Sequence, residues 1–278
     1  DVPITLNMEE LSRKEPDEDE LRRLFEELEF RTLIDRVLKT NKTTASPTPQ
    51  VSQPDLFGFF ADNGTDDSKN SSLKRLNDID VDYQLVDTEA KEDELLQLIL
   101  TRDNFALDTE TTGTDPISAE LVGMSFSFAE NQAFYVPVQS NRDEAQKLVD
   151  KFKPAFENES SLKIGQNIKY DILVLANYGV EVKGPMFDTM VAHYVLQPEL
   201  HRGMDYLAEV YLKYDTIKIE ELIGAKGKNQ KNMRDLSPEE VYKYACEDAD
   251  VTFKLKNILE KELVTNSVDK LFYEIEMP

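Results

Sequence analysis

Several residue types are scarce in this chain of 278 residues, which has no tryptophan, one cysteine and two histidines. A single cysteine excludes an intrachain disulfide and suits a reducing compartment, and so few cysteines and histidines argue against a zinc site. No apolar run approaches the roughly 20 residues that span a bilayer, and no signal peptide is visible. We therefore expect a cytoplasmic protein with no membrane partner.

Basic residues are also few, because 32 lysines and arginines face 55 acidic residues and leave a formal net charge of −23. Such an excess of negative charge disfavours binding of nucleic acid over a broad surface. Acidic residues that surround metal ions are an exception, since bound cations offset their charge. The composition therefore leaves carboxylate chemistry as the catalytic option.

The first acidic motif is Asp108-Thr109-Glu110, which follows the apolar residues 105–107. The apolar run is typical of a buried strand, and side chains two apart on a strand share a face. Two neighbouring carboxylates repel each other unless a proton or a cation bridges them, and their hard oxygens suit Mg²⁺ or Mn²⁺. By itself, the motif is better explained as solvated acids at the end of a strand.

Two further motifs shift that balance, and each sets two polar side chains four residues apart. Asn167 and Asp171 stand at the start of a predicted helix, where the helix dipole favours carboxylate and phosphate groups. Tyr244 and Asp248 share a face of a predicted helix over residues 238–263, which Ser237 would cap. Each pair alone also fits a structural role, either as a cap and a surface acid or as a core phenol and an exposed acid.

The three motifs together resemble those of the DEDD exonuclease superfamily in its tyrosine variant. Longer stretches resemble the 3′–5′ proofreading exonuclease domain of bacterial DNA polymerase I, a family A polymerase; they are residues 163–190, 204–209, 227–230 and 244–252. The resemblance implies an α/β, ribonuclease H-like fold with a mixed sheet flanked by helices. It also implies removal of nucleoside monophosphates from single-stranded or frayed DNA 3′ ends.

Apolar patterns in residues 81–264 predict the same kind of fold. Neighbouring strands early in this region, followed by alternating helices, argue for a mixed sheet covered by helices. Strands are expected near residues 83–86, 105–110, 121–128, 133–138 and 162–164, and helices near residues 91–100, 144–156, 167–177 and 238–263. Asp188 is expected to cap a helix or to support the metal ligands by contacting them, rather than to bind a metal ion itself.

The resemblance also implies a role for each matching residue. Asp108, Glu110 and Asp248 would hold one divalent ion, Mg²⁺ or Mn²⁺, and Asp108 with Asp171 would hold a second. Tyr244 would orient the attacking water. Four residues match positions that contact the DNA strand: Gln166, Asn167, Tyr170 and Thr114. Thr114 and Ile219 replace a leucine and an aromatic residue of relatives, so we expect a weaker grip on the strand.

The rest of the chain resembles the surroundings of such a domain. Residues 1–40 resemble the helical tail of a 5′ nuclease domain, and residues 265–278 resemble the start of a polymerase domain. Residues 41–80 are rich in Ser, Thr, Asn, Asp and Pro, which predicts a disordered linker. We expect the chain to be a piece of a longer protein, because it starts at Asp1 without a methionine.

An apolar island at residues 53–60 interrupts the predicted linker. Gln53, Asp55, Leu56 and Phe57 resemble the short peptide by which bacterial replication and repair proteins bind the sliding clamp. In an extended segment, Leu56 and Phe57 would enter an apolar pocket while the Gln53 amide supplies directional hydrogen bonds. The alternative is that the island packs on the exonuclease domain or on the nuclease tail.

Two other functions fit part of the pattern. One is an RNA-trimming exonuclease of the same superfamily, which the resemblance of both flanks to polymerase I domains disfavours. The other is a non-catalytic module that supports a polymerase domain. The presence of all four carboxylates together with Tyr244 argues for activity instead.

Overall fold

The computed structural model of this chain describes residues 17–27, 73–225, 227 and 230–278. The chain divides into two units, Asp1–Thr65 and Asp66–Pro278. The described part of the first unit, residues 17–27, contains helix α1 (Glu18–Glu27). Most of the predicted linker and the four candidate clamp-binding residues lie outside the described residues; these four are Gln53, Asp55, Leu56 and Phe57.

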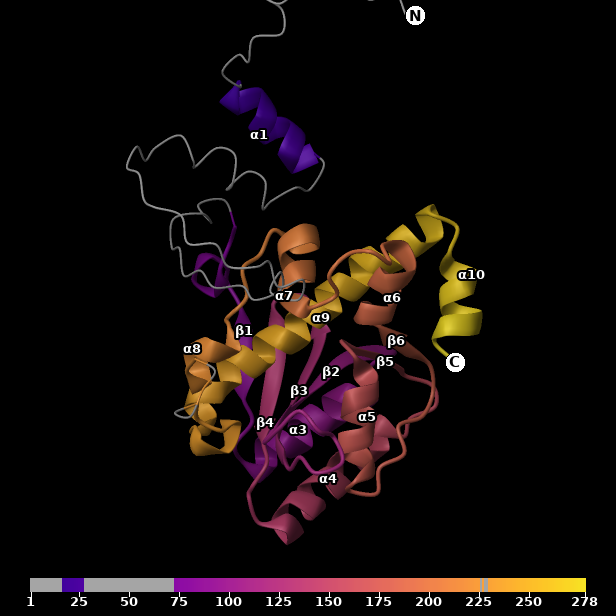
Figure 1. Ribbon diagram of the computed structural model, residues 1–278. Coiled ribbons are helices and arrows are strands. Elements are labelled where there is room, and N and C mark those ends of the chain that lie inside the picture. The colour runs from indigo at the N-terminus through magenta and orange to yellow at the C-terminus, as the bar shows by residue number, and fades with distance from the viewer. Residues whose placement is uncertain (1–16, 28–72, 226, 228–229) are drawn as a thin grey trace, which may run out of the picture. The chain divides into compact units, whose positions relative to one another are not determined.

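The second unit is built on a six-stranded mixed sheet with the strand order β1-β4-β3-β2-β5-β6 (Figure 1). The strands are β1 (Asp82–Leu85), β2 (Asn104–Thr111), β3 (Leu121–Ala129), β4 (Gln132–Pro137), β5 (Leu162–Gly165) and β6 (Met186–Asp188). β3 runs antiparallel to β2 and β4, and the other pairings are parallel. The carboxyl ends of β2, β5 and β6 therefore lie at one edge of the sheet, where open α/β sheets place their sites.

Helices cover both faces of this sheet (Figure 1). One face is covered by α3 (Glu89–Leu100), α4 (Arg142–Phe156) and α5 (Ile168–Ala176), and α9 (Pro238–Thr265) crosses the other. Phe105 and Phe126 belong to the core on the first face, whereas Ala106 belongs to the core on the α9 face. Because side chains alternate along a strand, Asp108 and Glu110 also face α9.

The remaining elements are short. They are η3 (Leu76–Asp78), α6 (Thr189–Leu196), α7 (Met204–Leu207), η4 (Ala208–Leu212), α8 (Ile219–Ile223), η5 (Met233–Asp235), α10 (Asp269–Leu271) and η6 (Phe272–Glu276). At the end of the chain, Phe272 is buried against Phe187 with ring centroids 4.8 Å apart, so this segment packs on the core of the α9 face. Among the described residues, no helix is both long and apolar enough to pass through a bilayer.

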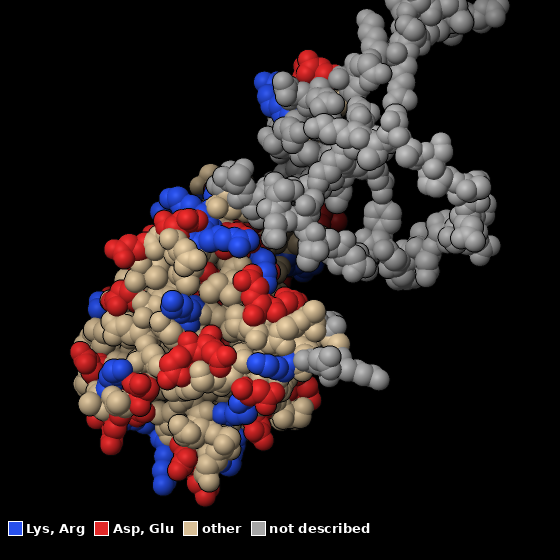
Figure 2. Space-filling model, turned by 90° about the vertical axis from the view of Figure 1, so that its left-hand side faces the viewer, with Lys and Arg blue, Asp and Glu red and all other residues tan. Residues whose placement is uncertain are grey.

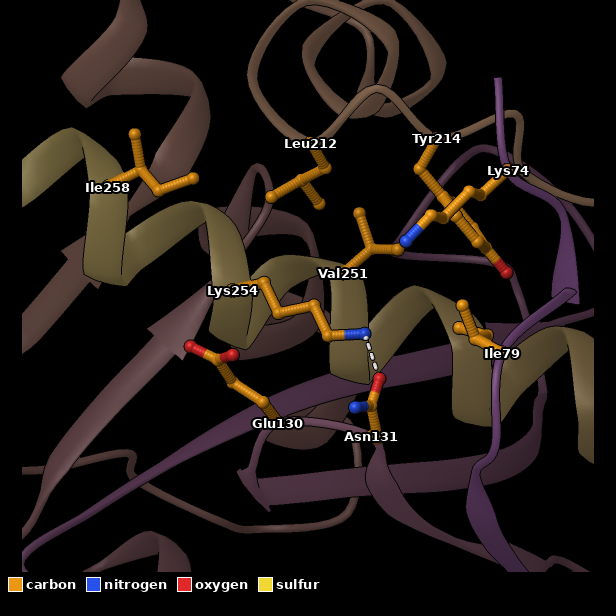
Figure 3. Close-up of a pocket in the computed structure, with 9 residues that line it drawn as sticks. All are labelled: Lys74, Ile79, Glu130, Asn131, Leu212, Tyr214, Val251, Lys254 and Ile258. Carbon is orange, nitrogen blue, oxygen red and sulfur yellow. Dashed lines mark hydrogen bonds between the residues drawn. The ribbon is translucent and has the colours of Figure 1, made fainter. Parts of the chain in front are cut away.

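A buried carboxylate, Asp250, anchors α9 to the sheet. It accepts hydrogen bonds from the Tyr83 hydroxyl on β1 (2.7 Å), the Asn131 N–H between β3 and β4 (2.8 Å) and the Lys254 ammonium (2.7 Å). Asn131 has a φ of 63°, in the left-handed region that asparagine tolerates. Figure 3 shows Lys254 reaching from α9 to Asn131 beside a pocket of about 290 Å³. These contacts fix the rotation of α9 against the sheet.

A buried lysine holds the loops around β5. Lys163 is 0% exposed, and its ammonium donates to the backbone carbonyls of Asn158, of Ser161 (3.0 Å) and of Lys183 (2.7 Å). Burial lowers the pKa of Lys163 to about 8. One side chain therefore ties β5 to the segments on either side of it.

We expect Lys163→Met to lower the free energy of unfolding by about 2–4 kcal/mol, since three carbonyls lose their donor while the side-chain volume is kept. Urea unfolding followed by circular dichroism measures the change. Lys147→Met is the matched control, because Lys147 is exposed on α4, and it should stay within about 0.5 kcal/mol of wild type. Equal stability of the two variants would show that the buried ammonium contributes nothing.

Candidate active site

Three carboxylates converge where α9 crosses the carboxyl end of β2. Oxygen atoms of Asp108, Glu110 and Asp248 lie within 4.8 Å of one another. The strand supplies the first two from one face, and α9 supplies the third. Glu110 is 6% exposed, and its Oε1 has no hydrogen-bond partner among the described residues. A buried acceptor without a donor is costly, so this oxygen is suited to a cation.

Burial raises the pKa of each carboxyl group in this cluster, and repulsion adds to the shift at Glu110 and Asp248. Burial raises the pKa of Asp108 to about 6. Burial, followed by the charges of Asp108 and Asp171, raises the pKa of Glu110 well above its usual value. Burial also raises the pKa of Asp248, and the charges of Asp108 and Glu110 add to the effect. Carboxylates that repel one another in this way favour a bound divalent cation.

Asp171 lies on α5, which covers the face of the sheet opposite to α9. It is not one of the three clustered carboxylates. β5 pairs with β2 only as far as Ala106, which leaves the edge of β2 open beyond that point. Asp171, in the first turn of α5, fills the gap, because its Oδ1 accepts hydrogen bonds from the Thr109 N–H (3.0 Å) and hydroxyl (2.6 Å). It is 2% exposed, and burial together with the charge of Asp108 raises its pKa.

Asp188, at the end of β6, sets the start of α5. Its carboxylate caps α6 by accepting from the N–H groups of Met190 (2.8 Å) and Val191 (3.2 Å), which confirms the predicted cap. It also accepts from the N–H groups of Asn167 (3.1 Å) and Ile168 (2.9 Å). Asn167 has a φ of 59° and precedes the helix instead of lying within its first turn. One carboxylate therefore fixes the starts of two helices.

Tyr244 lies one helical turn before Asp248 on α9 and is half-buried. Burial and the charge of Asp248 raise the pKa of Tyr244 above its usual value, so the phenol stays protonated at neutral pH. A protonated phenol beside several carboxylates is able to donate a hydrogen bond or to accept one from water.

A groove of about 730 Å³ opens beside Glu110. It is lined by Thr109, Glu110, Thr111, Thr112, Gly113, Thr114, Asn167, Tyr170, Ile219, Glu220, Ile223, Gln230, Lys231, Asn232 and Met233. One wall is the end of β2 with the loop that follows it and the start of α5, and the other is formed by α8 and residues 230–233. The Asn232 amide joins the two walls by donating to the Thr112 carbonyl (2.6 Å).

Three of the four predicted strand-contact residues, Thr114, Asn167 and Tyr170, line this groove. The fourth, Gln166, does not, because its amide donates to the carbonyl of Arg202 (2.7 Å) and its oxygen accepts from a hydroxyl on α6. Ile219, predicted as a departure from relatives, also lines the groove. The wall at residues 230–233 belongs to the basic stretch 224–234, for which the sequence leaves a solvated loop and a strand-contacting loop equally open.

The acidic excess does not form one continuous area on the face shown in Figure 2. Asp and Glu side chains are interspersed there with Lys and Arg side chains. Charges of mixed sign screen one another over short distances. On this face the net charge of −23 therefore does not appear as a single acidic patch.

Comparison with known proteins agrees with this arrangement. A family model described as 3′–5′ exonuclease matches residues 83–264. The chain belongs to this 3′–5′ exonuclease family. DNA polymerase I of Borreliella burgdorferi is 37% identical, over 75% of this chain and 23% of the relative. DNA polymerase I of Pseudomonas aeruginosa is 33% identical, over 100% of this chain and 29% of the relative.

The chain thus spans less than a third of the length of these curated relatives. The family match and these relatives confirm the prediction of a 3′–5′ exonuclease domain of the DNA polymerase I type.

Several solved structures share this fold. The catalytic core of RRP6 from Trypanosoma brucei has a TM-score of 0.54 at 17% identity and covers 69% of this chain and 50% of its own. Escherichia coli RNase D has a TM-score of 0.53 at 18% identity, with coverage of 67% and 46%. NrnC of Brucella melitensis with bound Mg²⁺ has a TM-score of 0.53 at 21% identity, with coverage of 69% and 86%. These likenesses confirm the predicted fold.

Proposed function

We propose that this domain hydrolyses the 3′-terminal phosphodiester bond of single-stranded or frayed DNA with two divalent ions, and releases nucleoside monophosphates. The observation that carries the proposal is the cluster of Asp108, Glu110 and Asp248, whose member Glu110 also lines an open groove. The Oε1 of Glu110, which has no hydrogen-bond partner in the described part of the chain, supports a cation in this cluster.

The donor set fits Mg²⁺ or Mn²⁺, because all of its atoms are hard carboxylate oxygens. Asp108, Glu110 and Asp248 would hold one ion, and Asp108 with Asp171 would hold the second. When bound, two such ions stabilise the entering and leaving oxygens of the scissile phosphate. The Mg²⁺ bound in the structure of NrnC is consistent with this choice of metal.

The chain's own side chains would orient the other reactants. The protonated phenol of Tyr244 would hold the attacking water by a hydrogen bond, because it stands beside the carboxylates on α9. Ile219, Ile223 and Met233 give the groove an apolar wall. Bases would pack on this wall without contacts that depend on the base sequence. The hydroxyl of Tyr170 is tied to the loop after β2, which holds its ring at the groove.

The relatives with substantial sequence identity are DNA polymerases, which favours DNA over RNA as the substrate. RNase D, an exoribonuclease, matches this chain in fold at 18% identity. The domain would therefore act beside a polymerase domain in the full-length protein. Residues 1–40 would be the tail of a 5′ nuclease domain, and residues 265–278 the start of the polymerase domain.

The clamp-binding peptide is a separate proposal that concerns residues outside the described part of the chain. Calorimetry with the cognate sliding clamp tests it by comparing wild type with Leu56→Ala/Phe57→Ala. We expect micromolar binding by wild type and none by the double variant. Equal binding by both proteins would rule the peptide out.

The proposed function predicts faster trimming of a single-stranded or mispaired 3′ end than of a paired one, since a paired end must first unstack. Oligonucleotides with a 5′ label resolve the shortening products on a gel, and an RNA of the same sequence serves as the comparison. Equal rates on single-stranded and paired DNA would contradict a single-strand groove. Trimming of RNA alone would move the assignment to an exoribonuclease.

A milder effect is expected for Tyr244→Phe, which removes the hydroxyl and leaves the metal ligands in place. Loss of one water-orienting hydrogen bond should slow trimming roughly 10–100-fold, measured as the single-turnover rate at saturating metal. Tyr242→Phe is the matched control on the same helix, and it should keep the wild-type rate. The role of Tyr244 is excluded if the two variants are equally active.

A further inference from the structure

Thr109 separates the two acids of the first motif, and its side chain points to the face of β2 opposite to theirs. It is 8% exposed and lies on the side of the sheet that α5 covers. There it meets Asp171, whose Oδ1 accepts from both the hydroxyl (2.6 Å) and the N–H (3.0 Å) of Thr109. Thr109 is thus the link between the first and second motifs.

Any residue other than proline at this position could donate the hydrogen bond from the backbone N–H, but the second hydrogen bond requires a side-chain hydroxyl. A β-branched side chain on a strand has a restricted χ1, so the hydroxyl is presented to Asp171 in one direction. Both bonds end on Oδ1, and Oδ2 receives neither of them. Together they lock the Asp171 carboxylate in one orientation against the open edge of β2.

We propose that Thr109 is a positioning residue of this exonuclease site, which acts by fixing the orientation of Asp171 and so sets the affinity for the second ion. The inference rests on the proposed two-ion function. A partner that orients a ligand in this way changes metal affinity about 10–100-fold when it is removed. The expected effect therefore falls on metal binding first and on rate as a consequence.

The experiment compares wild type with Thr109→Val, which keeps the shape without the hydroxyl, and Thr109→Ser, which keeps the hydroxyl. Thr252→Val is the matched control, since Thr252 is 0% exposed on α9 and its hydroxyl has no partner among the described residues. Calorimetric titration of the full chain with Mn²⁺ resolves the two binding events without substrate. Two further measurements are made. One is the Mn²⁺ concentration that gives half-maximal trimming, and the other is a crystal structure of Thr109→Val without metal.

We expect Thr109→Val to weaken the second Mn²⁺ binding event at least about 10-fold and to raise the half-saturating Mn²⁺ concentration by a similar factor. Thr109→Ser and Thr252→Val should match wild type, and the first binding event should be unchanged in all of them. Unchanged second-event affinity in Thr109→Val would overturn the inference, as would an unmoved Asp171 carboxylate in its crystal structure.

The same data separate this inference from the proposed function. If wild type binds two ions but trims no DNA, the proposed function is contradicted. The Mn²⁺ titration of Thr109→Val still tests the positioning role of Thr109 in that case. A wild type that binds only one ion contradicts both proposals.

Discussion

Replacing Asp108 with asparagine is expected to slow 3′-end trimming by about 10³-fold or more. The substitution keeps the shape of the side chain but removes the one carboxylate that would contact both ions. It also removes a charge that adds to the effect of burial in raising the pKa of Glu110, Asp171 and Asp248. The single-turnover rate on a single-stranded oligonucleotide at fixed Mg²⁺ measures the loss.

Thermal unfolding distinguishes loss of chemistry from loss of fold in Asp108→Asn. Without metal, the variant should unfold at a temperature no lower than that of wild type, because repulsion within the carboxylate cluster is reduced. Asp103→Asn is the matched control, since Asp103 is exposed one residue before the same strand, and it should keep full activity. Wild-type activity in Asp108→Asn would show that trimming does not depend on the carboxylate cluster.

Removal of divalent metal is expected to abolish trimming completely, and addition of Mg²⁺ or Mn²⁺ should restore it. The carboxylates repel one another without a cation, and none of the described side chains supplies a positive charge to the cluster. A ligand that binds only the folded state stabilises it by about 2.7 kcal/mol at 100 times its dissociation constant. A rise in unfolding temperature with Mn²⁺ concentration reports this binding without substrate.

The metal dependence has its own control in the same variants. Mn²⁺ should stabilise Asp103→Asn as much as it stabilises wild type, and Asp108→Asn much less. Trimming that persists in an excess of chelator would show that the carboxylates act without metal. Equal stabilisation of Asp108→Asn and wild type would place the bound ion elsewhere.

The parts of the site that rest on local spacing were predicted correctly from the sequence. The two-residue period of a strand places Asp108 and Glu110 on one face, and the four-residue period of a helix places Tyr244 beside Asp248. The cap formed by Asp188 also follows from a local pattern, because it depends on N–H groups two and three residues away.

Other parts of the site depend on distant segments and were beyond sequence reasoning. The contact of Asp171 with Thr109 requires that β5 stop pairing at Ala106, which is a matter of strand register. The hydrogen bond from the Gln166 amide to the carbonyl of Arg202, a residue from another loop, was not foreseen, and contact of Gln166 with DNA stays a prediction. The left-handed backbone of Asn167 is similarly imposed from β6.

The most direct test of the central claim is release of a labelled 3′-terminal nucleotide from single-stranded DNA by the full chain in Mg²⁺. We predict that the label appears at once as a nucleoside monophosphate, at a rate that falls to background in chelator or in Asp108→Asn. Label that stays on the DNA in the presence of Mg²⁺, or that leaves equally fast from Asp108→Asn, would contradict a metal-dependent 3′–5′ exonuclease at this site.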